Sequence, residues 1–460
     1  MKRYEYYRET ASPFLKEVPS HWEDTRIGRG YAEKSIGNND GEQLLSVFLN
    51  RGVVSYTDTD MKQVHKPSED MSSYQLVEPG DFVLNNQQAW RGSVGVSSYR
   101  GIVSPAYIVM TPIMDNNPRF MNYMLRETAC TAQFVLASKG VGSIQRILSP
   151  IKLKSSIMVL PPRAEQDQIV RYLDWQVSKI NRLIAVKKRQ LSILAEYRKA
   201  KIDEIILHGD KQAPQKDSGI WWLRDIPQSW QLIPLKRICQ VNASISNTAK
   251  QLSDEELVTF LPMESVSTTG TVDYSEKRRL GDVRSGYSSF ALDDVVIAKI
   301  TPCFENGKGA CLDSMDTDIG YGTTEFINLR ASDRILPRYL YMITMTQPFR
   351  KLGEEMMTGS AGQKRVPIEF VKGFAVGIPP IEEQARLLAL LNDVTKRIDC
   401  QTKSYYESII SLQELRTRLI SDVVTGQVDV RGIKVSDDEY INNEITEEEF
   451  EEESENNEEE

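Results

Sequence analysis

Two long stretches of the chain carry apolar residues at the spacing of an α-helix. Residues 163–208 and 381–426 contain no proline, and their apolar side chains recur every three or four positions. This spacing puts the apolar side chains in a stripe along one face of a helix, where a second helix can cover them. We therefore expect two helices of about 45 residues, each about 65 Å long if straight.

Both helices follow the same short motif. Residues 160–174 read LPPRAEQDQIVRYLD, and residues 378–392, 218 positions later, read IPPIEEQARLLALLN. Paired prolines need no amide donor at a helix start, and an acidic first turn suits the helix dipole. The motif therefore predicts the N-terminus of each long helix.

The motif belongs to a larger internal repeat. VPSHW (18–22) resembles IPQSW (226–230), and each long helix is followed by a glycine, at 209 and 426, with one residue of slippage. Further matches place Glu165-Gln166 on Glu383-Gln384, Ile180 on Ile398, Leu194 on Leu412, and Gln145-Arg146 on Gln363-Lys364. Between these landmarks the halves have little in common. The repeat therefore predicts a shared frame around two different inserts.

The inserts have the pattern of mixed α and β structure. Residues 120–138 and 337–356 predict helices. Short β-rich segments bounded by turn residues lie at 80–86, 93–99, 101–110, 293–301 and 323–330. Each insert thus reads as strands, a helix and a Gly-containing loop that leads into the frame helix. The predicted class is α/β (α+β), with two globular domains joined by two long antiparallel coiled-coil helices in an internal pseudo-repeat.

The two apolar stripes can cover each other if the helices pair. The alternative is that each helix packs only on its own globular domain. We favour pairing, because the stripes are longer than a small domain can cover. At 460 residues the chain is long enough for two or three domains. The predicted division is listed in chain order: a globular domain 1–159, a frame helix 160–209, a globular domain 210–377, a frame helix 378–430 and an acidic tail 431–460.

The net charge of −9 comes from the tail. Residues 444–460 hold 11 Glu and no Lys or Arg, so the rest of the chain carries +2. We expect this low-complexity segment to be a disordered, solvated extension. The alternative is a nucleic-acid mimic that shields a basic surface. In either case the charge of the folded part does not argue against a nucleic-acid partner.

The chain contains none of the common enzyme motifs. The chain has no dinucleotide-binding or phosphate-binding glycine loop, no Gly-x-Ser-x-Gly, no His-Glu-x-x-His, and no Asn/Asp-Pro-Pro-Tyr/Phe of the kind found in DNA amino-methyltransferases. Five scattered cysteines and three histidines argue against structural zinc. No apolar run reaches about 18 residues, the length of a membrane span. We expect a non-catalytic cytoplasmic protein with reduced thiols.

Polar and basic residues instead gather in the loops of both inserts. The first loop offers amides suited to an adenine edge, an aromatic face and a guanidinium: Asn85, Gln87, Gln88, Trp90 and Arg91. The second insert offers Lys299, Thr301, Asn306 and Lys308. Gly-containing basic loops precede both frames, with Lys139, Gln145 and Arg146 in one and Gln363, Lys364 and Arg365 in the other. Lysine and arginine there would neutralise DNA phosphates. Any one loop alone could be an ordinary connection, but two at matched places favour a binding role.

The repeated frame resembles the specificity subunit of type I restriction–modification systems. The resemblance covers about residues 18–430 and is carried by the order and duplication of the frame motifs. Segments that carry it are KDSGIWWLRDIPQSW (216–230), ITPCFENGKGA (300–310) and the frame from IPP to VVTGQ (378–427). The Glu-rich tail is not part of the family pattern.

The resemblance implies a division of labour. Each globular domain would be a target-recognition domain that reads one half of a split DNA site. The paired helices would set the spacing and dock two methyltransferase subunits. The residues at the interface with a partner or between the two helices would be Glu165, Gln166, Ile180, Leu194, Glu383, Gln384, Ile398 and Leu412. S-adenosylmethionine, ATP and Mg would be bound by the methyltransferase and motor/endonuclease subunits, and no cofactor by this chain. The alternative is a coiled-coil protein scaffold without DNA readout.

Overall fold

The computed structural model describes residues 2–37, 41–49, 51–56, 68, 70–139, 146–209, 212–360 and 362–435. The Glu-rich tail and Gln145 lie outside these residues. The chain divides into two compact units, one containing residues 1–188 and those from 407 onward, the other containing residues 189–406. The division falls inside both long helices. Each unit therefore contains the start of one long helix and the end of the other.

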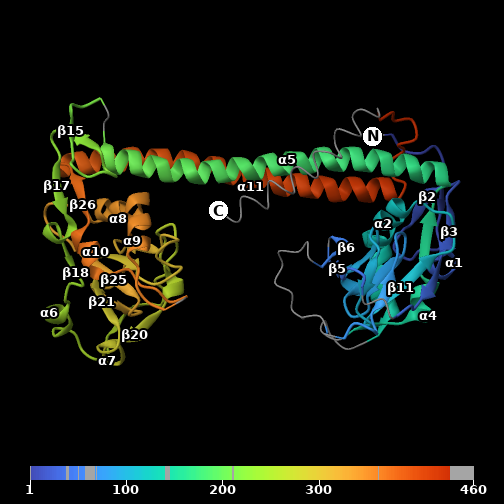
Figure 1. Cartoon of the computed structure of the whole chain (residues 1–460), viewed down its shortest axis with the longest axis horizontal. Helices are drawn as coiled ribbons and strands as arrows, with labels where there is room; N and C mark the ends of the chain where they lie inside the picture. Colours follow the sequence, from blue (N-terminus) through green and yellow to red (C-terminus); the bar gives the residue numbers. More distant parts are fainter. Residues whose placement is uncertain are drawn as a thin grey trace. The chain divides into compact units, whose positions relative to one another are not determined.

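Both predicted long helices are present (Figure 1). The first consists of α5 (Arg163–Asp203) followed by a π-helical turn, η2 (Glu204–His208), and the second is α11 (Ile381–Val424). The π-turn accounts for the slippage in the repeat. A π-turn accommodates an extra residue in a helix, and the first helix needs one more residue than the second to reach its glycine.

Each unit contains a four-stranded antiparallel sheet of the same topology. In the first unit the order is β4 (Tyr31–Lys34), β11 (Tyr107–Pro112), β8 (Phe82–Asn85) and β9 (Val94–Val96). In the second it is β18 (Cys239–Val241), β25 (Phe326–Ala331), β22 (Val295–Ala298) and β23 (Gly309–Cys311). The inserts therefore share a sheet although their sequences scarcely match.

The units differ in what is added to that sheet. The first unit has two-stranded ribbons, β5 (Leu45–Phe48) with β6 (Gly52–Ser55) and β7 (Gln75–Val77) with β10 (Gly101–Val103). The second has a further four-stranded sheet in the order β20 (Lys277–Arg279), β19 (Leu257–Leu261), β24 (Ile319–Gly322) and β21 (Ser288–Ala291). Residues 101–110, predicted as one β-rich segment, contain β10 and the start of β11 with a turn between them.

Each stretch predicted as helical is two helices. Residues 120–138 contain α2 (Pro118–Arg126) and α3 (Thr128–Ala137), and residues 337–356 contain α8 (Pro337–Met345) and α9 (Gln347–Glu355). Glu127 and Thr346 are extended at the breaks and serve as N-caps of the second helices. Pro348 supports the second break, because proline is tolerated in the first turn of a helix but not in its interior.

The connection into each frame helix is longer than predicted. A short helix and a buried strand follow the loop: α4 (Pro150–Ser155) with β14 (Ile157–Leu160), and α10 (Ile368–Gly373) with β26 (Ala375–Ile378). β14 pairs with β3 (Glu23–Arg26), and β26 pairs with β17 (Gln231–Pro234). The remaining elements are listed here: β1 (Tyr7–Glu9), β2 (Glu17–Pro19), α1 (Ile27–Gly30), η1 (Ala89–Arg91), β12 (Ser138–Lys139), β13 (Ile147–Leu148), β15 (Gln215–Asp217), β16 (Asp225–Pro227), η3 (Leu235–Arg237), α6 (Ser246–Ala249), η4 (Met263–Ser265) and α7 (Leu280–Val283).

The glutamine of the Glu-Gln motif ties each long helix to its globular domain. Gln166 accepts a hydrogen bond from Asn117 N (2.8 Å) and donates to Pro161 O (3.0 Å). Gln384 repeats this with Leu336 N (2.8 Å) and Pro379 O (3.0 Å). Both glutamines are buried, and Asn117 and Leu336 are the N-caps of α2 and α8. We expected these glutamines at the interface with a partner or with the other long helix. They instead join the long helix to its own unit.

A second tie uses the end of the other long helix. In the second unit, Asp203 near the end of α5 accepts bonds from Gln347 N (2.9 Å) and Nε2 (3.1 Å) at the start of α9. In the first unit, Ser421 near the end of α11 donates to Glu127 Oε1 (2.8 Å) at the start of α3. Residues 203 and 421 are related by the same shift of 218. The carboxylate belongs to the long helix in the second unit (Asp203) and to the N-cap of the short helix in the first (Glu127).

The Pro-x-x-Trp motif packs on the glycine that ends the long helix of its unit. Trp22 lies against Gly426, and Trp230 lies against Gly209. Both tryptophans are buried, and both glycines have positive φ, 73° and 56°. A Cβ at Gly209 would lie 2.6 Å from Trp230 Cζ2. Glycine is therefore required for both its conformation and its size.

The long helices contact each other within both units. In the first, Arg416 of α11 donates to Asn181 Oδ1 of α5 (2.8 Å); in the second, Arg198 of α5 pairs with Asp399 of α11. The two contacts lie 17 residues apart along each helix. Of the frame residues predicted at this stripe, Ile180 and Ile398 are buried and Leu194 and Leu412 are half-buried. The predicted pairing is confirmed in each unit.

Replacing Gly209 by alanine should destabilise the second unit by about 1–3 kcal/mol more than Gly219→Ala. Both glycines have positive φ, but nothing lies within 4 Å of a Cβ at Gly219. The difference therefore reports the contact with Trp230 together with the backbone of Gly209, whose ψ of −134° also favours glycine. Calorimetric melting of the full chain measures it, and equal transition midpoints for the two variants would contradict this packing.

Candidate nucleic-acid interface

The loop after β8 is shaped by its own polar residues. Asn85 Oδ1 accepts a hydrogen bond from Gln87 N (3.1 Å), and Trp90 Nε1 donates to Gln87 O (3.0 Å). Gln88 O accepts from Arg91 N (2.9 Å), which closes the turn η1. Gln87 and Arg91 are exposed, while Gln88 and the Trp90 ring are half-buried. The loop thus presents an indole ring in a fixed position.

The basic loop before the first frame meets this ring. Asn86 Oδ1 accepts from Leu148 N (3.0 Å), which ties the loop after β8 to the β12–β13 ribbon. The guanidinium groups of Arg91 and Arg146 lie 4.8 and 5.2 Å from the centre of the Trp90 ring. These distances are within the range of cation–π attraction. The structure therefore brings Trp90, Arg91 and Arg146 together. Lys139 is exposed on β12, paired with Ile147.

The second unit joins the two corresponding loops. Thr301 N donates to Lys364 O (3.0 Å), and Val366 N donates to Lys299 O (2.9 Å). Gln363, Lys364 and Arg365 are exposed. The predicted residues Lys299, Thr301, Lys364 and Arg365 therefore form one group.

An acidic residue that the sequence reasoning missed lies in this group. Arg365 donates from Nε to Glu325 Oε2 (3.0 Å) and from Nη2 to Oε1 (2.7 Å). The bond from Arg365 lowers the pKa of Glu325 below its ordinary 4.5. Such a fork-to-carboxylate pair fixes the plane of the guanidinium as well as its position. No motif marks Glu325, because its partner is 40 positions away in the sequence.

Two further predicted residues of the second insert lie outside this group. Lys308 Nζ donates to Met263 O (2.9 Å) and is directed into its own domain. Asn306 is exposed on the wall of a cavity that also contacts α8 and α9.

The two loop pairs lie at equivalent positions in their respective units. One loop of each pair follows the strand third in the sheet order, β8 or β22, and the other follows the second short helix, α3 or α9. Each unit thus builds one basic group from loops far apart in sequence. Among the described residues, no group of three His, Cys, Asp or Glu could hold a metal ion. No helix in the described part of the chain is long and apolar enough to span a bilayer.

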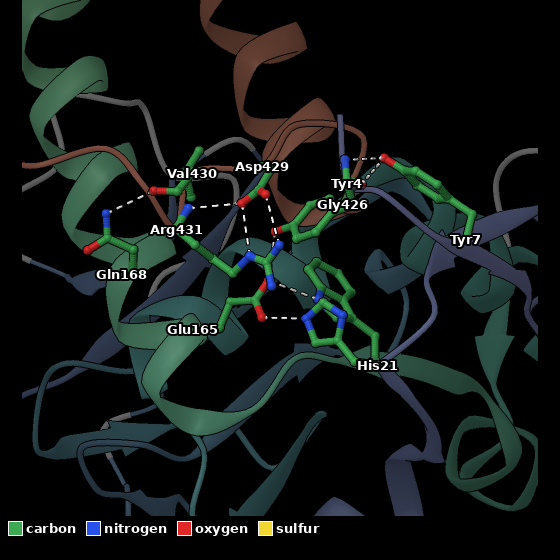
Figure 2. A network of polar contacts seen from close by, with 10 residues as sticks. Tyr4, Tyr7, His21, Glu165, Gln168, Gly426, Asp429, Val430 and Arg431 are labelled. Carbon is green, nitrogen blue, oxygen red and sulfur yellow. Dashed lines mark hydrogen bonds and ion pairs between the residues drawn. The ribbon is translucent and has the colours of Figure 1, made fainter. Parts of the chain in front are cut away.

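The sequence patterns also did not predict a polar network at the start of α5 (Figure 2). Glu165 is buried and accepts from Tyr4 OH (2.6 Å) and Trp22 Nε1 (3.1 Å), and His21 Nε2 lies 2.7 Å from its second oxygen. Burial, reinforced by Glu165, raises the pKa of Tyr4. Glu165, expected at a partner interface, therefore holds the N-terminal segment on α5. Its counterpart Glu383 is half-buried and pairs with Arg386 (3.5 Å).

The segment after α11 closes the same network. Tyr7 OH donates to Gly426 O (3.0 Å), and Gln168 Nε2 donates to Val430 O (3.0 Å). Arg431 lies over the Tyr4 ring, 4.8 Å from its centre, and pairs with Asp429 (2.9 Å). The first and last described segments of the chain are thus held together on the first unit.

Known proteins share this arrangement of two sheets and two long helices. No family model matches the chain. Over 206 residues it is 36% identical to the specificity subunit of the type I restriction enzyme EcoAI and 34% identical to that of EcoEI, both from Escherichia coli. Each match covers 44% of this chain and 34% of the relative. The chain thus matches about a third of the length of these curated relatives.

Two solved structures have a similar fold over most of the chain. A chain from a type I restriction–modification assembly gives a TM-score of 0.64 at 13% identity, covering 89% of this chain and 99% of that one. The HsdS subunit of Thermoanaerobacter tengcongensis gives 0.50 at 14% identity, covering 89% and 98%. In both sequence and fold, the chain is similar to specificity subunits of type I restriction–modification systems, which confirms the resemblance drawn from the duplicated motifs.

Replacing Glu325 by glutamine should lower stability at neutral pH, and the loss should shrink at acid pH. The lowered pKa means that the carboxylate contributes fully above its unfolded value near 4.5 and loses that contribution as the pH falls through the lower folded value. We expect a loss of about 0.5–1 kcal/mol at pH 7 and a smaller loss at pH 3. Melting curves at both values test this. The exposed Glu264→Gln, whose carboxylate makes no ion pair with any described residue, is the control and should change neither curve.

Proposed function

We propose that the chain is the DNA-recognition subunit of a type I restriction–modification complex. One observation carries the proposal. In each unit two polar, basic loops lie together, and they do so at equivalent positions of equivalent sheets. Each loop pair would contact one half of a split DNA site. Amide side chains suit base edges, and lysine and arginine suit phosphates. The named residues of both loop pairs, including Lys139 and Gln145, stand as the proposed contacts.

The paired long helices would fix the separation of the two readers. Two modest half-site readers on one spacer gain effective concentration only when the half-sites match its length. The five-part division of the chain into domains, frame helices and tail belongs to this proposal. Frame residues exposed along α5 and α11 would dock the methyltransferase subunits.

The chemistry would belong to those partners. Two methyltransferase subunits would bind S-adenosylmethionine, and a motor/endonuclease subunit would use ATP and Mg. This chain would act in the cytoplasm and contribute DNA contacts and geometry, without catalysis. The competing function, a protein scaffold without DNA readout, predicts no salt-dependent DNA binding by the complex.

The double variant Trp90→Ala/Arg146→Ala should weaken binding of the complex with its methyltransferase to duplex DNA by about tenfold or more. Loss of one phosphate contact should also reduce the slope of log affinity against log salt by about 1. Fluorescence anisotropy with a labelled duplex measures both. Arg29→Ala, which removes an equal charge from the exposed face of α1 in the same unit, should bind as the unchanged chain does. Equal losses in both variants would make the effect one of net charge.

Adding seven residues to both long helices, after Lys188 and after Tyr406, should lengthen the DNA spacer that is read. Seven residues preserve the apolar stripe and add about 10 Å of helix, which equals about three base pairs of duplex. Methylation mapping of cells that express this variant with its partner measures the change. An active variant that still reads sites with the original spacer would contradict the proposal that the paired helices set the spacing.

A further inference from the structure

The second unit contains a cavity of about 930 Å³ between its globular domain and its long helices. Its walls come from α5, α8, α9 and α11 and from the loops at 268–269 and 305–307. Of the residues proposed to contact DNA, Asn306 lies on the wall of this cavity, and the other residues of the second loop pair do not line it. Its size lies within the range of small-molecule sites, which are mostly apolar with a few convergent polar groups.

Three polar atoms on the cavity walls are buried without partners. Within the described chain, Arg350 Nε, Tyr341 OH and Glu305 Oε2 make no hydrogen bond. The residues Arg350 and Tyr341 are only 7% and 5% exposed. Buried polar groups normally have partners, and one that stays unpaired costs about 1–3 kcal/mol. Three of them around one cavity are suited to binding a polar ligand.

Arg350 is the unusual member of this group. Its Nη1 donates to Phe304 O (2.9 Å), but none of the ion pairs among the described residues involves it. Burial lowers its pKa to about 10 and raises that of Tyr341 to about 12. A buried cation without a carboxylate is a ready partner for an anion.

The rest of the lining defines the ligand further. Lys199 and Lys351 add positive charge, against Glu305 and Glu354. Met342, Met345, Leu388 and Leu391 supply an apolar wall. Because Arg350 and Tyr341 are almost fully buried, a duplex cannot bring its phosphates to them, whereas a small molecule can enter.

We propose that this cavity binds a small organic anion, whose carboxylate or phosphate contacts Arg350 and Tyr341 and whose apolar part packs on the methionines and leucines. A donor group on the same molecule would meet Glu305. The site is separate from the proposed DNA-binding loops Lys299–Thr301 and Gln363–Arg365.

Titration calorimetry and melting of the purified full chain test the site with three probes. Phenylacetate is a carboxylate with an apolar body, ADP is a phosphate with one, and pyrophosphate is a phosphate without one. We expect phenylacetate or ADP to bind and raise the melting midpoint, and pyrophosphate to bind more weakly than ADP. Whichever of the first two binds identifies the anionic group. No binding of either at about 10 mM would overturn the proposal.

Variants locate the binding. Tyr341→Phe should weaken it about tenfold and Arg350→Met about 100-fold, as expected for losing a neutral and a charged hydrogen-bond donor. Tyr341→Phe removes only an unpaired hydroxyl, so it keeps the test usable if Arg350→Met fails to fold. Arg284→Met, an exposed arginine of the same unit outside the cavity, should bind as the unchanged chain does. Unchanged binding in both cavity variants would place the anion elsewhere and overturn the site. DNA binding of Tyr341→Phe should stay normal, so this test and that of DNA recognition fail separately.

Discussion

Gln166 and Gln384 each hold three groups of their unit with one buried amide. Gln166 bonds Asn117 N, Asn116 Oδ1 and Pro161 O, and Gln384 bonds Leu336 N, Arg334 O and Pro379 O. The amide therefore fixes the first turn of a long helix to the first turn of the short helix beside the sheet. Because each amide is buried, losing it would leave several polar groups unpaired. The orientation of each globular domain on its frame depends on this contact.

The end of the other long helix provides the second point of attachment. Asp203 binds the start of α9, Ser421 binds the start of α3, and the tryptophans pack on the terminal glycines. Each domain is thus held between the beginning of one helix and the end of the other. The extra sheet of the second unit supplies none of these contacts. This explains how one frame can carry inserts with unrelated sequences.

The frame could be predicted from sequence because its signals are local. Proline pairs, an apolar stripe and a terminal glycine each report on their own few residues. The common sheet could not be predicted in this way. Its equivalent strands, such as β4 and β18 or β8 and β22, share their place in the topology but have no similar sequence. Nor could the breaks at Glu127 and Thr346, where a capping residue interrupts an otherwise helical pattern.

The candidate site was predictable in part. The loops containing Trp90, Arg146, Lys364 and Arg365 were identified by residue type, and the meeting of the loops had to come from the fold. Glu325, the Glu165 network and the cavity around Arg350 combine residues from distant segments, so no local pattern marks them. Residue type can also mislead. Lys308 is a basic residue in a candidate loop, but it donates inward to Met263 O.

The central claim is that one frame holds two independent readers of DNA. Replacing residues 31–155, the insert of the first unit between β3 and β14, by the corresponding insert of a type I specificity subunit with a known target leaves Gln166 and Trp22 in place. Single-molecule methylation mapping of cells that express this chimaera with its methyltransferase tests the claim directly. The account predicts that one half of the methylated sequence changes and the other half stays the same. A change in both halves, or methylation of the original sequence, would contradict it.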